Sequence, residues 1–115
     1  MPDVMNPEDP LYVYQTEVSK VPPLNVAEEA KCVEHIRASD GMANCARKRL
    51  VEAHLDRVIA LAKVYHNSGT HILDLIEQGN EGLIAAVADL GQFKTGAFWE
   101  FAKPFVERSL KDLAG

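Results

Sequence analysis

The chain has 115 residues, 47% of them hydrophobic and 25% charged, which suits one small domain with a modest core. No apolar run approaches the roughly 20 residues of a membrane span, and the N-terminus lacks the basic and apolar parts of a secretion signal, which predicts a cytoplasmic protein without membrane contact. The net charge of −5 argues against a general nucleic-acid binder.

The first predicted elements follow a flexible tail, residues 1–8. A short helix is expected over residues 11–18, and Val21-Pro22-Pro23 then interrupts the chain because proline is excluded from helix interiors. Asn25 to Glu28 has the form of a capping box, which begins a helix that runs to about residue 38. A turn at residues 39–41 follows it.

Three longer helices complete the chain. One is predicted from about residue 43 to residue 66, one over about residues 70–90, and one from about residue 97 to residue 113. No strand alternation or repeat is present, so residues 9–115 are predicted to form one all-α domain, a compact bundle of about four to five helices.

The helix over residues 70–90 has a sorted surface. Three carboxylates and an amide share one side, and no Lys or Arg between residues 64 and 93 relieves their repulsion: Asp74, Glu77, Gln78 and Glu81. The opposite side is apolar: Ile72, Leu73, Ile76, Leu83, Ile84 and Val87. Gly79 and Gly82 each cost this helix roughly 1 kcal/mol relative to alanine. A basic partner that approaches the backbone closely explains both features, and so does a solvated acidic face with two packing glycines.

Asn80 is a polar residue on the apolar side of the same helix, about 240° from Asp74. A buried amide needs hydrogen-bond partners, so the structural interpretation is that Asn80 packs against a neighbouring helix and forms a hydrogen bond with it.

Neither a metal site nor an enzyme is predicted. Cys32 and Cys45 are expected to be free thiols, and the Cys32–His35 spacing has no second pair to complete a metal site. No nucleophile–base pair or phosphate-binding loop is present, so no catalytic residue and no cofactor is assigned.

Several segments resemble the sigma-70 family of bacterial RNA polymerase sigma factors, domain 2 with part of the preceding conserved segment. Residues 73–83 are similar to the core-binding helix of that family, whose consensus runs close to Leu-Asp-Leu-Ile-Gln-Glu-Gly-Asn-Ile-Gly-Leu. Residues 49–65 resemble the family segment Arg-Leu-Val-Glu-Ala-Asn-Leu-Arg-Leu-Val-Val-Ser-Ile-Ala-Lys-Arg-Tyr. Residues 9–14 and 21–24 resemble its opening segment, so the likeness runs in register from about Asp9 to Asp89.

The resemblance implies that the acidic helix docks on a coiled coil in the largest subunit of core RNA polymerase. The polymerase-binding positions are then Asp74, Glu77, Gln78 and Asn80, to which the acidic face adds Glu81. The family order at the middle two positions is Gln then Glu, which this chain reverses. An anti-sigma protein that covers this helix is a further partner that the resemblance allows.

The likeness weakens over residues 94–113, where the family captures flipped bases of the non-template strand at the minus-ten promoter element. Pro104-Phe105 replaces a Trp pair of the family, and Glu100 and Glu107 add carboxylates on the side expected to meet phosphate. The candidate DNA contacts are Phe98, Trp99, Phe101, Lys103, Phe105, Arg108 and Lys111. An apolar face that closes the bundle, beside a solvated basic edge, is the alternative reading of these residues.

Two functions are therefore carried forward. The first is a transcription initiation factor domain that docks on core RNA polymerase and contacts the minus-ten element. The alternative is a sigma-like regulator or competitor that binds polymerase but does not melt promoters, which the altered aromatic segment motivates.

Overall fold

The computed structural model describes residues 9–67, 69–93 and 96–114, so the predicted tail over residues 1–8 lies outside the described residues. These ranges contain six α-helices, one short 3-10 helix and no strand, which confirms the all-helical prediction. No helix within them is long and apolar enough to cross a bilayer. The elements are α1 (Pro10–Ser19), α2 (Val26–Ala38), α3 (Ala43–Glu52), α4 (Leu55–Tyr65), α5 (Ile72–Ala88), η1 (Leu90–Gln92) and α6 (Phe98–Ala114).

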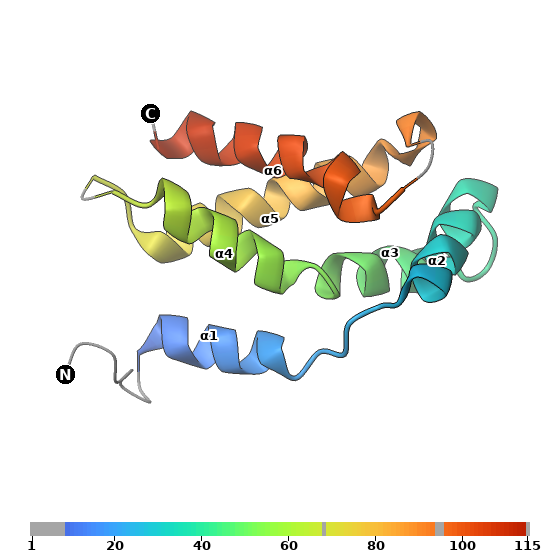
Figure 1. The fold of residues 1–115 in the computed structure, drawn as a ribbon, viewed down its shortest axis with the longest axis horizontal. Helices are drawn as coiled ribbons and strands as arrows, with labels where there is room; N and C mark the ends of the chain where they lie inside the picture. The colour runs from blue at the N-terminus through green and yellow to red at the C-terminus, as the bar shows by residue number, and fades with distance from the viewer. Residues whose placement is uncertain (1–8, 68, 94–95, 115) are drawn as a thin grey trace.

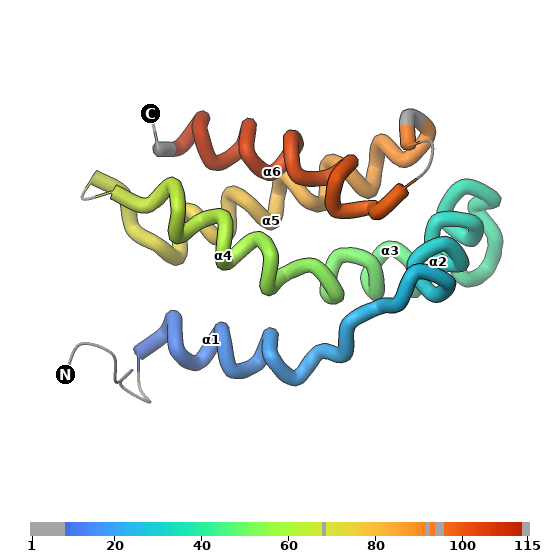
Figure 2. The backbone as a smooth tube through the Cα atoms, in the orientation of Figure 1, coloured from blue at the N-terminus to red at the C-terminus, as the bar shows by residue number. Residues whose placement is uncertain are grey.

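The helices form an elongated bundle. Figure 1 shows α5 and α6 side by side along one edge, with α4 next to them and α1 on the other side of α4. Helices α2 and α3 pack on each other at the end where the chain enters α6. The trace in Figure 2 shows α3 and α4 following one another along nearly one line.

The single helix predicted over residues 43–66 is wrong, because the chain breaks between α3 and α4 at residues 53–54. In a continuous helix the His54 N–H would bond to the carbonyl of Leu50. Here that N–H bonds to the Val51 carbonyl at 3.0 Å, and the His54 ring Nδ1 lies 2.7 Å from the Leu50 carbonyl instead. A buried side chain thus replaces one backbone bond and ends the helix.

The buried side of α5 is rotated from the predicted one. Leu75, which the periodicity left outside the apolar side, is completely buried, whereas Ile84 is 50% exposed. The reason is that α6 packs on the side that carries Gly79, Gly82 and Ala86, all buried. Small residues contribute little to a hydrophobic pattern but allow a helix to approach closely, so they mark the true interface.

The two glycines of α5 are explained by close packing against α4 and α6. A Cβ on Gly82 would lie 2.6 Å from the Phe105 carbonyl oxygen and 2.8 Å from Val106 Cα, and one on Gly79 would lie 2.7 Å from Val58 Cγ1. The prediction of two packing glycines is therefore confirmed, and their presence needs no external partner.

Helix α6 closes the core through four completely buried residues: Phe98, Ala102, Val106 and Leu110. Their spacing of four keeps them on one stripe. Pro104 lies on the exposed side of the helix, which continues through it. The Glu100 carbonyl that Pro104 leaves without an N–H is therefore on a side that water can reach, which accommodates the proline.

The turn predicted at residues 39–41 is present, with Ser39 in the left-handed region at φ 51°. Asp40 Oδ2 bonds to His35 Nδ1 at 2.7 Å, and Asp40 Oδ1 accepts the Met42 N–H at 2.8 Å. These two bonds, that to His35 first, lower the pKa of the Asp40 carboxyl below its ordinary value of 3.8.

A lowered folded-state pKa makes the contribution of Asp40 to stability depend on pH. The contribution is fully present above about pH 3.8 and is lost as pH falls through the folded-state value. We expect Asp40→Asn to lower the melting temperature slightly at neutral pH and to have no effect in strong acid. Thermal melts of both proteins across that range measure this, and a constant difference at every pH would contradict it.

Candidate functional site

The acidic side of α5 is open to solvent. Asp74, Glu77 and Glu81 are exposed and Gln78 is half-buried. None of the three carboxylates forms an ion pair with any residue in the described ranges. Since α5 itself has no basic residue, the row keeps its negative charge free for a partner. We call Asp74, Glu77, Glu81 and the adjoining Ile84 the acidic face.

Ile84 is the member that the sequence missed. It lies one turn beyond Glu81 and two turns beyond Glu77, and half of its surface is exposed. An exposed apolar side chain beside charges is typical of a docking surface, where apolar contacts are surrounded by polar ones. The available signal was the row of small residues at Gly79, Gly82 and Ala86, which places the packed side of the helix away from Ile84.

Asn80 lies beside this face, one turn before Ile84, and is half-buried. Its Nδ2 donates to the Tyr14 hydroxyl of α1 at 3.1 Å, and its buried Oδ1 has no partner among the residues that the structure describes. The predicted hydrogen bond from Asn80 to a neighbouring helix is confirmed, and that helix is α1. A partner that used the Asn80 Nδ2 as a donor would compete with the Tyr14 hydroxyl.

The predicted DNA-contacting aromatic residues lie in the first half of α6, where the phenylalanine rings pack on one another and Trp99 stacks on His54. Phe98 is completely buried, so its ring is part of the core and does not fit the predicted DNA contact. Phe101 and Phe105 are half-buried with ring centroids 5.2 Å apart, and Phe101 also lies 5.4 Å from Phe93. Trp99 is half-buried beneath the Arg57 guanidinium, at 5.8 Å.

The basic candidates on α6 are accessible. Lys103, Arg108 and Lys111 are exposed, and within the described ranges none has an ion-pair partner. Glu100 is also exposed, as expected. Glu107 differs from its predicted position, because it is half-buried and accepts the Tyr65 hydroxyl of α4 at 3.4 Å.

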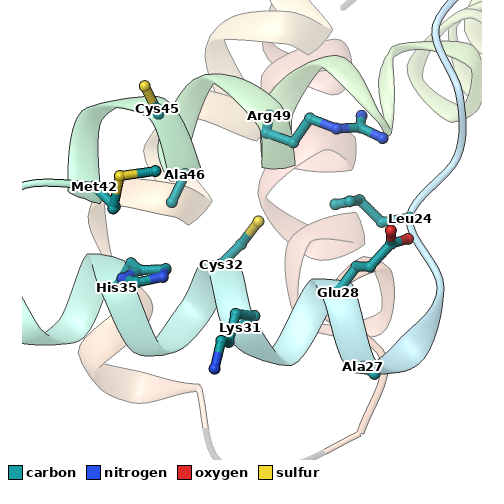
Figure 3. A pocket seen from close by; sticks show the side chains of 10 residues that line it. All are labelled: Leu24, Ala27, Glu28, Lys31, Cys32, His35, Met42, Cys45, Ala46 and Arg49. Carbon is teal, nitrogen blue, oxygen red and sulfur yellow. The ribbon is translucent and has the colours of Figure 1, made fainter.

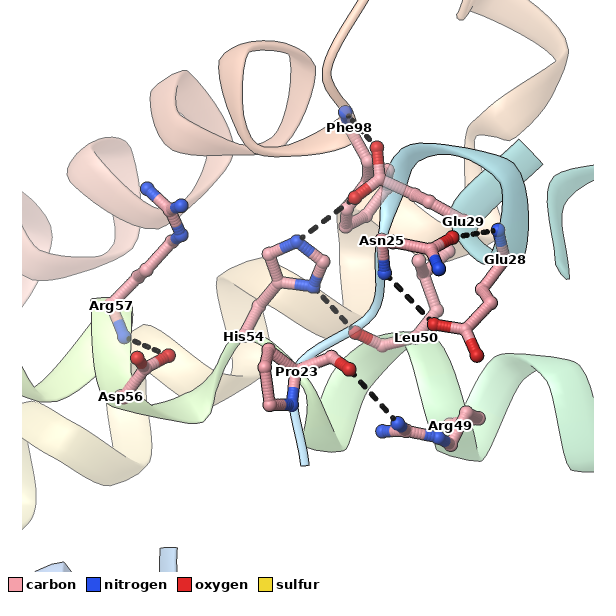
Figure 4. A network of polar contacts seen from close by, with 10 residues as sticks. All are labelled: Pro23, Asn25, Glu28, Glu29, Arg49, Leu50, His54, Asp56, Arg57 and Phe98. Atoms are coloured by element: carbon pink, nitrogen blue, oxygen red, sulfur yellow. Dashed lines mark hydrogen bonds and ion pairs between the residues drawn. The ribbon is translucent and has the colours of Figure 1, made fainter. Parts of the chain in front are cut away.

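A buried polar network fixes the start of α6 (Figure 4). Glu29 of α2 accepts the Phe98 N–H at 2.7 Å through Oε1, and its Oε2 lies 3.5 Å from His54 Nε2. Because the Leu50 carbonyl can only accept, His54 Nδ1 donates to it, which leaves Nε2 facing Glu29. One carboxylate thus joins α2, the α3–α4 break and α6. The sequence offered only one sign of this network, a histidine within an apolar stripe.

Glu29→Ala should destabilise the fold because it leaves the Phe98 N–H and the His54 ring without their partner. We expect the free energy of unfolding to fall by about 2–3 kcal/mol, as measured by urea denaturation. Glu29→Gln keeps an acceptor for the N–H and offers an amide to His54, so it should lose much less. Unchanged stability of the alanine variant would contradict this role.

Within the described ranges, no group of three or more His, Cys, Asp or Glu side chains is arranged to hold a metal ion. Cys32 and Cys45 are both free.

Comparison with known proteins gives a consistent set of relatives, although no family model matches the chain. The chain is 35% identical to RNA polymerase sigma factor SigA of Lactococcus lactis subsp. cremoris, over 90% of this chain and 28% of that protein. It is 36% identical to SigA of Clostridium acetobutylicum, over 99% of this chain and 30% of the relative. It is 36% identical to RNA polymerase sigma factor RpoS of Coxiella burnetii, over 89% of this chain and 29% of that protein. The chain thus spans less than a third of the length of these relatives.

Proposed function

Because this chain belongs to the sigma-70 family of RNA polymerase sigma factors, as a region of such a factor, we propose that it docks on core RNA polymerase and acts in transcription initiation in the cytoplasm. The observation that carries the proposal is the row of exposed, unpaired carboxylates on α5. In this role the chain itself catalyses no reaction.

The proposed partner surface is a coiled coil of the largest polymerase subunit that presents arginines. Asp74 and Glu81 are seven residues apart, so the carboxylates extend over about 10 Å, or two helical turns. Charge-assisted hydrogen bonds from arginine are stronger than neutral ones, and free carboxylates need not abandon an internal partner to form them. The reversed order at Glu77 and Gln78 fits this geometry, since the carboxylate occupies the more exposed of the two positions.

Contact with the minus-ten promoter element is the second part of the proposal. The candidates are those α6 residues that retain accessible surface: Trp99, Phe101, Lys103, Phe105, Arg108 and Lys111. The three basic side chains would meet phosphates, and the aromatic rings would stack on unpaired bases. Phe98 is omitted because it is completely buried.

The ring packing favours the alternative function, a sigma-like regulator or competitor that occupies polymerase without melting promoters. A flipped base would have to displace the contacts that Phe101 makes with Phe93 and Phe105. Exposed Glu100 on the same helix would also repel phosphate.

The docking test is binding of this chain to the isolated coiled coil of the largest subunit, followed by fluorescence anisotropy. We expect saturable binding that weakens as salt is added. Absence of binding at tens of micromolar would contradict the proposal. Adding a non-template minus-ten oligonucleotide to the chain with core polymerase then separates the two functions, because only the promoter-contacting protein retains it.

A further inference from the structure

An open groove of about 710 Å³ lies between α2 and α3. Its lining is mainly apolar, with charged groups at its rim, and includes Leu24, Ala27, Cys32, Met42, Cys45 and Ala46. Figure 3 shows the Cys32 sulfur pointing across the groove toward α3, whereas the Cys45 sulfur points away from α2. The proposed docking function uses none of these residues.

One end of the groove carries a guanidinium that the fold leaves partly unsatisfied. Arg49 Nη2 donates to the Pro22 carbonyl at 2.8 Å, but buried Nη1 has no hydrogen-bond partner in the described part of the chain. Glu28 lines the same end, yet its Oε1 accepts the Asn25 N–H at 2.9 Å, and no ion pair joins Glu28 to Arg49. Within the described residues Arg49 pairs with no carboxylate, and a carboxylate is the group that a guanidinium binds most strongly.

We propose that this groove binds a small amphipathic carboxylate, with its head on Arg49 and its apolar chain along Cys32 toward Met42. The volume lies within the range of roughly 300–1,000 Å³ that is usual for small-molecule sites. From Glu28 to His35 the α2 wall extends for about 10 Å, which suits a medium-length alkyl chain. The adjoining Lys31 adds a second positive charge at the rim.

Decanoate, kept below its micelle concentration, is the probe, and calorimetric titration of the whole chain is the measurement. We expect saturable binding of one molecule per chain. Decanol, which has the same alkyl chain without the carboxylate, should bind with an affinity at least about tenfold lower than that of decanoate. Equal affinity for both, or no saturable binding of decanoate, would overturn the proposal.

Two matched variants locate the site. Cys32→Phe fills the groove and should abolish decanoate binding, whereas Val64→Phe adds a ring at an exposed position of α4 that does not line the groove and should leave binding unchanged. Arg49→Gln should weaken binding about tenfold, but it also releases the Pro22 carbonyl, so the comparison of Cys32→Phe with Val64→Phe decides. Unchanged affinity in a folded Cys32→Phe protein would place decanoate elsewhere and overturn the assignment.

Thiol alkylation gives an independent readout in the unmodified protein. Burial raises the pKa of the Cys32 thiol, which Arg49 opposes only in part, so Cys32 should react slowly with N-ethylmaleimide. Bound decanoate should slow Cys32 further and affect Cys45 much less, because Cys45 also lines the groove but its exposed sulfur points away from α2. Equal protection of both thiols, or of neither, would contradict occupation of the groove.

Discussion

Gly82→Ala should lower the free energy of unfolding by about 2–3 kcal/mol, although alanine is the better helix former by roughly 1 kcal/mol. The added Cβ would lie 2.6 Å from the Phe105 carbonyl oxygen and 2.8 Å from Val106 Cα. Both atoms belong to the backbone of α6, so the whole helix has to shift to relieve the overlap. The loss of packing therefore outweighs the gain in propensity, and urea denaturation followed by circular dichroism measures the result.

Two other glycines provide graded controls. At Gly79 the nearest atom is the Val58 Cγ1 at 2.7 Å, a side-chain atom that can rotate away, so Gly79→Ala should cost less than Gly82→Ala. Nothing lies within 4 Å of a Cβ placed on Gly91, so Gly91→Ala should be nearly neutral. A Gly82→Ala protein as stable as the Gly91→Ala protein would mean that α5 and α6 are not held this closely.

Glu77→Lys should weaken binding to the polymerase coiled coil by about 2 kcal/mol, or roughly thirtyfold, because it replaces an attractive contact with a repulsive one. Glu77 is exposed and has no ion-pair partner in the described part of the chain, so stability should hardly change. Asp74→Ala removes one charge without reversing it and should have a smaller effect. Anisotropy titrations at fixed salt give the affinities.

Glu34→Lys is the matched control for charge. Glu34 is an exposed carboxylate on α2, away from the acidic face, and its reversal changes the net charge by the same two units. We expect Glu34→Lys to reduce affinity only slightly, through long-range attraction that salt screens. Equal losses of affinity in both variants would mean that the acidic face contributes only through long-range charge. No loss of affinity in Glu77→Lys would mean that the face is a solvated surface without a role in docking.

The sequence by itself determined the helical content and the features that depend on neighbours along the chain. The capping box forms with both bonds, since Asn25 Oδ1 accepts the Glu28 N–H at 2.8 Å and Glu28 Oε1 accepts the Asn25 N–H at 2.9 Å. The exposure of Asp74, Glu77 and Glu81 was also predictable, because charges at helical spacing gather on one side and are too costly to bury unpaired. These features require only contacts within a few residues.

The tertiary structure alone decided which arc of each helix is buried and where polar side chains find partners. Glu29 reaches the Phe98 N–H 69 residues away, and Tyr14 reaches Asn80 across 66 residues. The helix break at His54 and the buried Phe98 are both held by contacts with Glu29. The exposure of Ile84 follows from the side of α5 on which α6 packs. Periodicity fixes the angles between side chains on one helix, but the burial of an arc depends on a second helix whose contacts no local pattern specifies.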